Sequence, residues 1–238
     1  MQNLRSRIAG RQSGFTLVEI AIVLVIIGLL LVGVLQGQEM IENTKVKSLV
    51  SDMKSIQVAY NGYLDRYKAI PGDESVAIML NRGWPGTGGA VAGAATPNGL
   101  LVVLPAATFA VAAASEHEGF WRGLRASGLL TGDPTALAAA AHPKHSMGGL
   151  IGIASNPGVA IPTVLGLPGV HVCANNLTTK QAAAIDVLVD GPLPANQIGN
   201  NTGNLRASTA ALAAAAPAAL AYDEATTVAT WNVCMRIG

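Results

Sequence analysis

An apolar run near the N-terminus constrains the fold of this 238-residue chain more than any other feature. From Phe15 to Leu35 the sequence reads FTLVEIAIVLVIIGLLLVGVL, about 21 residues in which Glu19 is the single charged side chain. As an α-helix this run is about 30 Å long, which matches the hydrocarbon core of a bilayer. A secretory signal peptide has a shorter apolar core of about 7 to 15 residues, so we expect the run to be retained as a transmembrane helix.

The charges around the run predict its orientation. Arg5, Arg7 and Arg11 precede it, and no acidic residue does. Basic flanks stay on the cytoplasmic side of a membrane, so residues 1–14 are predicted to be a cytoplasmic leader and the chain beyond about residue 36 to lie outside. Net charge is +1 and only 12% of residues are charged, so no overall field indicates a nucleic-acid partner.

A helical pattern continues beyond the membrane run. Apolar residues recur at the i, i+3, i+4, i+7 spacing of an amphipathic helix from Val46 to Tyr67, and Pro71-Gly72 is a stop signal. We therefore predict one helix over residues 15–70, transmembrane at about 15–35, whose outer half packs on a head formed by residues 71–238.

The head is predicted to mix short helices and strands. Residues 82–99 are rich in Gly, Ala and Pro and predict an exposed loop. Helix is expected over 106–124, with Ser115 as a cap and Phe120, Trp121 and Leu124 in the core, and again over 178–189 with Thr178 or Thr179 as its cap. Strands are expected over 150–154, 159–165, 170–173 and 226–237. The Ala-rich stretches 136–141 and 207–221 are placed only as short helix or loop.

The two cysteines, Cys173 and Cys234, permit one disulfide. If they pair, the cross-link stabilises the fold by about 4 kcal/mol in the chain-entropy model and needs an oxidising compartment such as a periplasm. The alternative is a pair of buried free thiols.

The junction of leader and apolar run, Ser13-Gly14-Phe15-Thr16-Leu17-Val18-Glu19-Ile20, resembles the signal of type IV pilins and of type II secretion pseudopilins. This resemblance implies cleavage after Gly14 by a prepilin peptidase and N-methylation of the new N-terminal residue, Phe15. It also implies a structural role. The Gly-rich loop lacks a Gly-Lys-Ser/Thr ending and the local sequence suggests no Ser/His/Asp or Cys/His set, so no enzyme and no cofactor are predicted. The expected fold is α+β: a type IV pilin-like ladle, with the long helix packed on a small antiparallel sheet.

Glu19 is the residue of this junction that needs a partner. A carboxylate in a lipid-facing helix costs about 2.5 to 3.5 kcal/mol on insertion scales. By the resemblance, the Phe15 amine of a neighbouring subunit pairs with Glu19 and sets the subunit register in the filament. The alternative is that Glu19, close to the helix start, extends to the headgroups.

Weaker similarities continue along the chain. The segment from Tyr63 to Asp73 resembles the Tyr-x-x-x-Pro-Gly-Asp segment found in many pilin-like proteins. Asp186 and Asp190 lie one helical turn apart and are weak candidates for a calcium site of the kind that some pseudopilins have, but two carboxylates are too few ligands. His142 and His145 lack a nearby Cys or carboxylate and are interpreted as a solvated loop rather than a metal site.

The sequence predicts a structural subunit of a type IV pilus-like filament, assembled from the inner membrane. The expected partners are copies of itself, other pilin-like subunits, the prepilin peptidase and methyltransferase, and an inner-membrane platform with its ATPase. Before assembly the subunit is expected to be a single-pass inner-membrane protein, and afterwards part of a filament at the cell surface or in the periplasm. One alternative to a pilus for adhesion, motility or DNA uptake is a pseudopilin that pushes exoproteins outward. A remote alternative is a membrane-tethered enzyme or binding domain.

Overall fold

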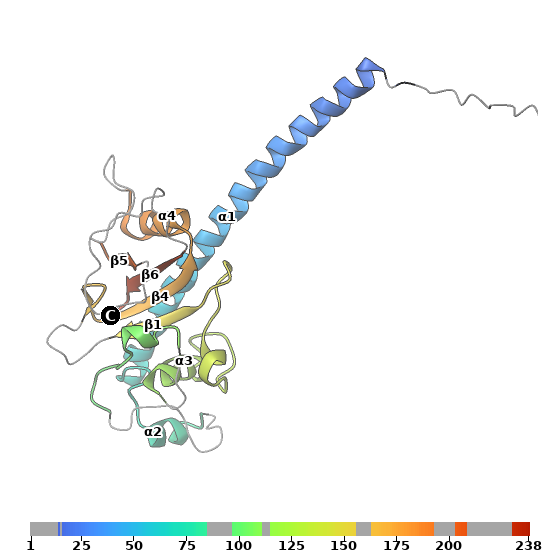
Figure 1. The fold of residues 1–238 in the computed structure, drawn as a ribbon. Coiled ribbons are helices and arrows are strands. Elements are labelled where there is room, and N and C mark those ends of the chain that lie inside the picture. The colour runs from blue at the N-terminus through green and yellow to red at the C-terminus, as the bar shows by residue number, and fades with distance from the viewer. Residues whose placement is uncertain are drawn as a thin grey trace, which may run out of the picture. The chain divides into compact units, whose positions relative to one another are not determined.

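A computed structural model gives the fold (Figure 1). It describes residues 14, 16–84, 97–110, 115–155, 163–192, 203–208 and 230–238. The chain divides into two units between Thr44 and Lys45, which are considered separately below.

The longest element is α1, Leu17–Tyr67, a helix of 51 residues. It ends where Lys68 adopts a left-handed conformation, φ 54°, three residues before Pro71. In the following turn, Gly72 has φ 94°, and a Cβ there would meet the backbone of α3 (Glu116–Ala126) at Glu116 and Phe120. The Pro71-Gly72 turn therefore requires its glycine for both conformation and packing.

The head is built on a four-stranded antiparallel sheet in the order β1-β4-β6-β5 (Figure 1). The strands are β1 (Ile151–Ser155), β4 (Val170–Leu177), β5 (Leu205–Ser208) and β6 (Trp231–Arg236). A two-residue hairpin pairs β2 (Thr163–Val164) with β3 (Leu167–Pro168). The α+β class with a long N-terminal helix and a small antiparallel sheet is confirmed.

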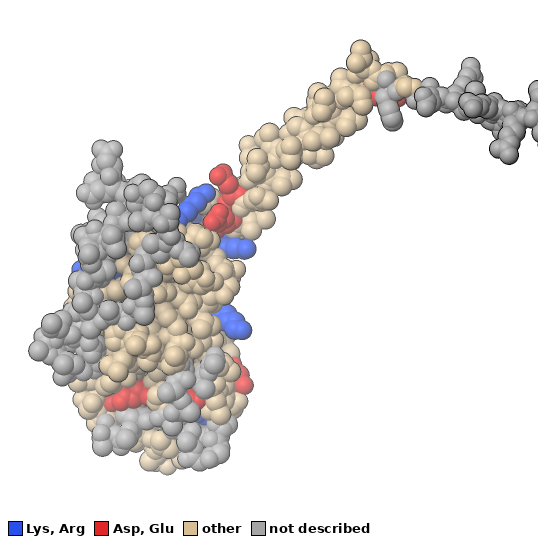
Figure 2. Space-filling view, viewed as in Figure 1, with Lys and Arg blue, Asp and Glu red and all other residues tan. Residues whose placement is uncertain are grey.

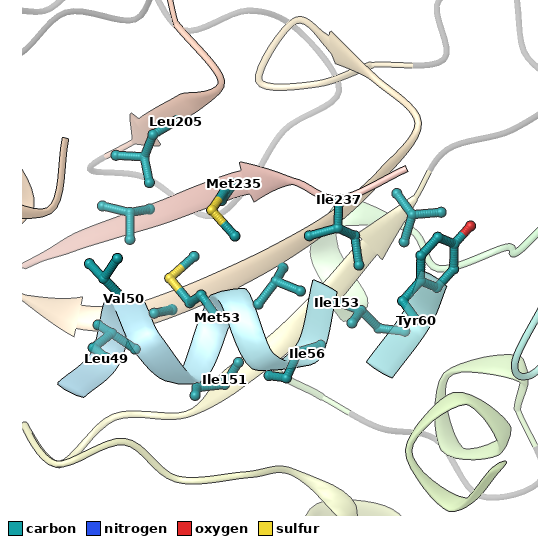
Figure 3. Close-up of a cluster of buried hydrophobic side chains, with 14 of the residues drawn as sticks. Leu49, Val50, Met53, Ile56, Tyr60, Ile151, Ile153, Leu205, Met235 and Ile237 are labelled. Carbon is teal, nitrogen blue, oxygen red and sulfur yellow. The ribbon is translucent and has the colours of Figure 1, made fainter. Parts of the chain in front are cut away.

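The outer half of α1 provides one side of the main core. Its buried residues recur every three or four positions. Leu49, Met53 and Ile56 lie against side chains of β1, β5 and β6 and against Ile237, which follows β6 (Figure 3). Leu49 and Met53 are fully buried. The predicted apolar stripe therefore packs as expected.

The opposite face of the sheet carries the disulfide. Cys173 of β4 pairs with Cys234 of β6 across the ladder, with Cα atoms 4.0 Å apart, and the two sulfur atoms are bonded. Alternate residues point to opposite faces of a strand, so Val172 and Ala174 enter the main core while Cys173 packs with Ala154 and Leu165. The cross-link joins the two central strands of the sheet.

Three further helices have side-chain caps. Ser75 caps α2 (Val76–Asn81), Ser115 caps α3 (Glu116–Ala126), and Thr178 forms a capping box with Gln181 at the start of α4 (Thr179–Asp190). The predicted caps Ser115 and Thr178 are confirmed, as is the core position of Phe120, Trp121 and Leu124. The helix α2 was not predicted.

Other predictions in the head differ from the structure. The first part of the expected helix is wrong over residues 106–110, where only the 3₁₀ turn η1 (Pro105–Ala107) forms. Pro105 suits the first position of a turn, but no side chain caps it at Leu104. The second part of the expected helix forms as α3. Residues 111–114 and most of the predicted strand 159–165 lie outside the described residues. Within the predicted last strand, β6 forms from Trp231 to Arg236, Thr230 and Ile237 lie outside it, and residues 226–229 are outside the described residues. The Ala-rich stretch at 136–141 forms the 3₁₀ turn η2 (Ala138–Ala141). The loop predicted over 82–99 and the Ala-rich stretch 207–221 fall largely outside the described residues.

Candidate functional site

The start of α1 is organised by a reciprocal pair of hydrogen bonds. The backbone N–H and the hydroxyl of Thr16 donate to Oε2 of Glu19, at 2.8 and 2.9 Å, and the backbone N–H of Glu19 donates to the Thr16 hydroxyl at 3.3 Å. This is a capping box, which satisfies two N–H groups that a helix start leaves open. It holds the Glu19 carboxylate toward the N-terminal end of the helix.

The capping box gives Glu19 a partner that the sequence analysis did not consider. The Thr-x-x-Glu spacing at 16–19 is the sequence signal of this capping box, whereas the partners predicted above were a neighbouring subunit and the lipid headgroups. Gly14 is exposed, and Phe15 lies outside the described residues. Glu19 is itself exposed, so the local hydrogen bonds leave its carboxylate accessible.

The helix beyond Glu19 presents apolar side chains on every side. Leu17, Leu24 and Leu30 are 91%, 64% and 63% exposed. Figure 2 shows this stretch as a continuous tan surface with acidic side chains at both ends. Among the described helices, α1 is the one long and apolar enough to cross a membrane. A surface of this kind is stable in lipid or against other apolar helices, and not in water.

Three glycines interrupt this surface. An added Cβ at Gly28, Gly33 or Gly37 would meet nothing within 4 Å in the chain itself. The fold of one subunit therefore does not require these glycines. Close approach by another helix and local unwinding are the two uses that glycine has in such a helix.

The turn after α1 is held by two consecutive acidic residues. Asp73, which belongs to the segment resembling a pilin motif, accepts the backbone N–H groups of Asn98 and Gly99. The next residue, Glu74, forms an ion pair with Arg82 at 2.5 Å and accepts a hydrogen bond from the hydroxyl of Tyr63. Burial and the neighbouring Glu74 carboxylate raise the pKa of the Tyr63 hydroxyl. These residues fasten the chain on both sides of residues 83–97.

The weak calcium candidates are used in other ways. Both carboxylate oxygens of Asp190 accept backbone N–H groups, from Asn204 and Leu205, which ties α4 to β5. Asp186 is buried in the head. Within the described ranges no group of three or more His, Cys, Asp or Glu side chains could hold a metal ion.

The interpretation of His142 and His145 as a solvated loop is wrong. Both side chains are buried, at 5% and 4% exposed. Nδ1 of His142 lies 3.1 Å from the Ile151 carbonyl, and Nε2 of His145 lies 3.0 Å from the Asn175 carbonyl. The polar residue types suggested an exposed loop, but both imidazoles hydrogen-bond to backbone carbonyls of the sheet region.

Comparison with known proteins gives one match. The model for the prokaryotic N-terminal methylation motif matches residues 10–35, which include Gly14, Phe15, Thr16, Glu19 and most of the exposed apolar part of α1. No curated protein and no solved structure matches the chain. The match covers none of the head, so the account of the head rests on its own structure. Residues 10–35 of this chain are the prepilin-type signal of type IV pilins and pseudopilins.

Proposed function

We propose that this protein is a structural subunit of a type IV pilus-like filament, made as a precursor that is cleaved after Gly14 and methylated on Phe15. One observation carries the proposal: the methylation motif at residues 10–35 continues into a helix that is apolar and exposed on every side. The motif implies processing by a prepilin peptidase. The exposed helix supplies a surface that first lies in the membrane and then packs against other subunits.

The chemistry of Glu19 supports assembly through its carboxylate. Cleavage after Gly14 would create an amine at Phe15, next to the Thr16 N–H that already donates to Glu19. In a bundle of such helices the amine of one subunit can neutralise the Glu19 carboxylate of its neighbour. A charge in an apolar environment is costly unless it is paired, so this pairing would favour one register between subunits.

Adhesion, motility, DNA uptake and protein export are different uses of the same filament architecture. An inner-membrane platform and its ATPase are expected to provide the work of extraction in each. We therefore propose a filament subunit. The filament that we favour is a cell-surface pilus, and the alternative is a periplasmic pseudopilus of type II secretion.

The test is the intact mass and N-terminal sequence of the protein from membranes and from sheared surface fractions of its native host. We expect a chain that begins with methylated Phe15. Its presence in sheared filaments would establish a surface pilus, and its restriction to membranes would favour a pseudopilin. A chain that begins at Met1, in a host with an active prepilin peptidase, would contradict the proposal.

A further inference from the structure

A seam between α3 and the chain at residues 141–142 concentrates basic groups in the interior of the head. His117, Trp121 and Arg125 are four residues apart along α3, so they share one face of the helix. His142 packs on this face, with ring centroids 5.1 Å from His117 and 6.5 Å from Trp121. Arg125 Nη2 donates to the Ala141 carbonyl at 2.7 Å. We call these residues the α3 seam.

The seam contains most of the unsatisfied buried nitrogen atoms in the described part of the chain. Nε2 of His142, Nε1 of Trp121, and Nε and Nη1 of Arg125 are buried without a hydrogen-bond partner. Both ring nitrogens of His117 are also buried without a hydrogen bond of good geometry, although the Ala107 carbonyl is near enough to favour its charged form. Buried polar atoms in proteins are nearly always paired, so six such atoms in one seam are unusual. The side chains of His117 and His142 are only 3% and 5% exposed.

The protonation state of His142 follows from its hydrogen bond. A carbonyl can only accept, so Nδ1 carries the proton shared with the Ile151 carbonyl. Nε2 is then an unprotonated, buried acceptor. Adding a proton to Nε2 would create a cation and a new donor, and no described acceptor is in hydrogen-bonding position there.

The charged groups around the seam do not compensate such a cation. Arg125 already contributes one positive charge, and it disfavours protonation of His142. Asp133 acts on Arg125 and Arg122, but it is exposed and its carboxylate accepts the backbone N–H and the hydroxyl of Thr135. Of the groups acting on His117, His142 disfavours the charged form and the Ala107 carbonyl favours it.

His145 provides the contrast within the same segment. It is buried to a similar degree, but Asp52 of α1 favours its charged form and Asn175 offers a carbonyl. A proton on His145 therefore meets a carboxylate, whereas a proton on His142 meets a guanidinium and a proton on His117 meets His142 and only the neutral Ala107 carbonyl. The two sites differ in the charge of their neighbours.

We propose that the α3 seam is an acid-sensitive latch, in which proton uptake by His117 and His142 separates α3 from residues 141–142 while the disulfide-linked sheet stays folded. Opening exposes both imidazoles to water, where each can be charged. It also exposes the buried indole of Trp121. A fall in pH would thus change the surface of the head without unfolding its sheet.

The pH range follows from the titration of the two histidines. Burial is the main cause that lowers the pKa of His117 to about 3 and that lowers the pKa of His142, whereas a solvated histidine titrates near 6.5. The open form therefore binds protons that the closed form does not, and the seam is closed above about pH 6.5. Below that pH, the opening equilibrium constant rises by about tenfold per pH unit for each histidine.

The test is hydrogen exchange of the full chain in detergent micelles at pH 7 and pH 5, corrected for the intrinsic rate. We expect amides of α3 to lose at least tenfold protection at pH 5 and to be less protected there than those of β4 and β6, because the open seam leaves the sheet folded. His117→Phe combined with His142→Asn, which keeps a donor near the Ile151 carbonyl, should abolish the loss of protection in α3. His171→Phe, a buried histidine of β4, is the matched control and should leave the response of α3 unchanged.

Two results would overturn the latch. One is equal protection of α3 and of the sheet at pH 5 in the unmodified protein, which would mean that both exchange by global unfolding, and this comparison needs no variant. The other is an unchanged response of α3 to pH in the double variant or in His117→Phe alone.

Discussion

Between Leu17 and Thr44, α1 leaves its apolar side chains exposed, whereas between Val46 and Tyr63 the same helix buries a stripe of them in the head. The first part finds few contacts within its own chain, so lipid or other subunits must supply its environment. The second part already has its partners, because the sheet covers the stripe. The comparison separates the part of the protein that an assembly completes from the part that folds on its own core.

The largest expected effect in the first region comes from Glu19. Glu19→Ala should leave membrane insertion intact and abolish filaments, because it removes both the capping interaction with Thr16 and the charge available to a neighbouring amine. Glu19→Gln is the control, since its amide oxygen can still accept the Thr16 N–H but carries no charge. Electron microscopy and shearing of cells would measure assembly.

The two variants separate the roles of Glu19. If the intersubunit charge pair determines assembly, both variants lack filaments. Normal filaments with Glu19→Gln would show that capping is sufficient, and normal filaments with Glu19→Ala would remove Glu19 from the assembly mechanism altogether.

The second prediction concerns the disulfide, which belongs to the head alone. Replacing Cys173 and Cys234 by alanine should lower the free energy of unfolding of the head by about 4 kcal/mol, because the bridge closes a loop with a sequence separation of 61 residues. Urea unfolding of the full chain in detergent, followed by tryptophan fluorescence, would measure it. The helical signal of the membrane part should persist through the transition, and its loss together with the head would contradict the independence of the two regions.

Sequence periodicity predicted the two halves of α1 because both signals are local. The apolar run needs only composition and length, and the stripe from Val46 to Tyr63 needs only the 3.6-residue repeat. The caps Ser115 and Thr178 were predictable for the same reason. Each is a short-range pattern next to a helix.

The missed features depend on contacts between distant residues. The strand β5 has only four residues, and its pairing with β6 comes from a segment far along the chain. The burial of His142 and His145 depends on the backbone carbonyls of Ile151 and Asn175, which no local pattern indicates. Glu19 is an exception, because the Thr-x-x-Glu spacing is a local signal of a capping box, whereas the resemblance to a filament signal predicts a partner in another subunit.

The third prediction compares two leucines of α1. Leu49→Ala should lower the free energy of unfolding of the head by about 3 kcal/mol, because Leu49 is fully buried and its removal leaves a cavity. Leu30→Ala makes the same change on the same helix where the side chain is 63% exposed, and it should leave the head unaffected. Chemical unfolding of both variants in detergent would measure the difference. An equal effect would mean that the head depends on the membrane part for its stability.

The smallest expected effect is a pH dependence of the free energy of unfolding of the head. It arises from His171 in the sheet and should not change the stability of the membrane part. Burial lowers the pKa of His171 to about 4 from its ordinary value near 6.5. The unfolded chain then binds a proton that the folded head does not, so stability is complete above about pH 6.5 and decreases as the pH falls toward 4. Between pH 7 and pH 5.5 this histidine should cost the head about 1 kcal/mol.

His171→Phe should remove that share of the pH dependence, because phenylalanine fills a similar volume without titrating. The measurement is the free energy of unfolding of the unmodified protein and the variant at both pH values, in detergent. The difference between the two slopes isolates His171 from the histidines of the α3 seam, whose contribution remains in both proteins. If the slopes are equal, the His171 imidazole is already charged in the folded head or reaches water there, and the sheet is less closed around β4 than its complete burial indicates.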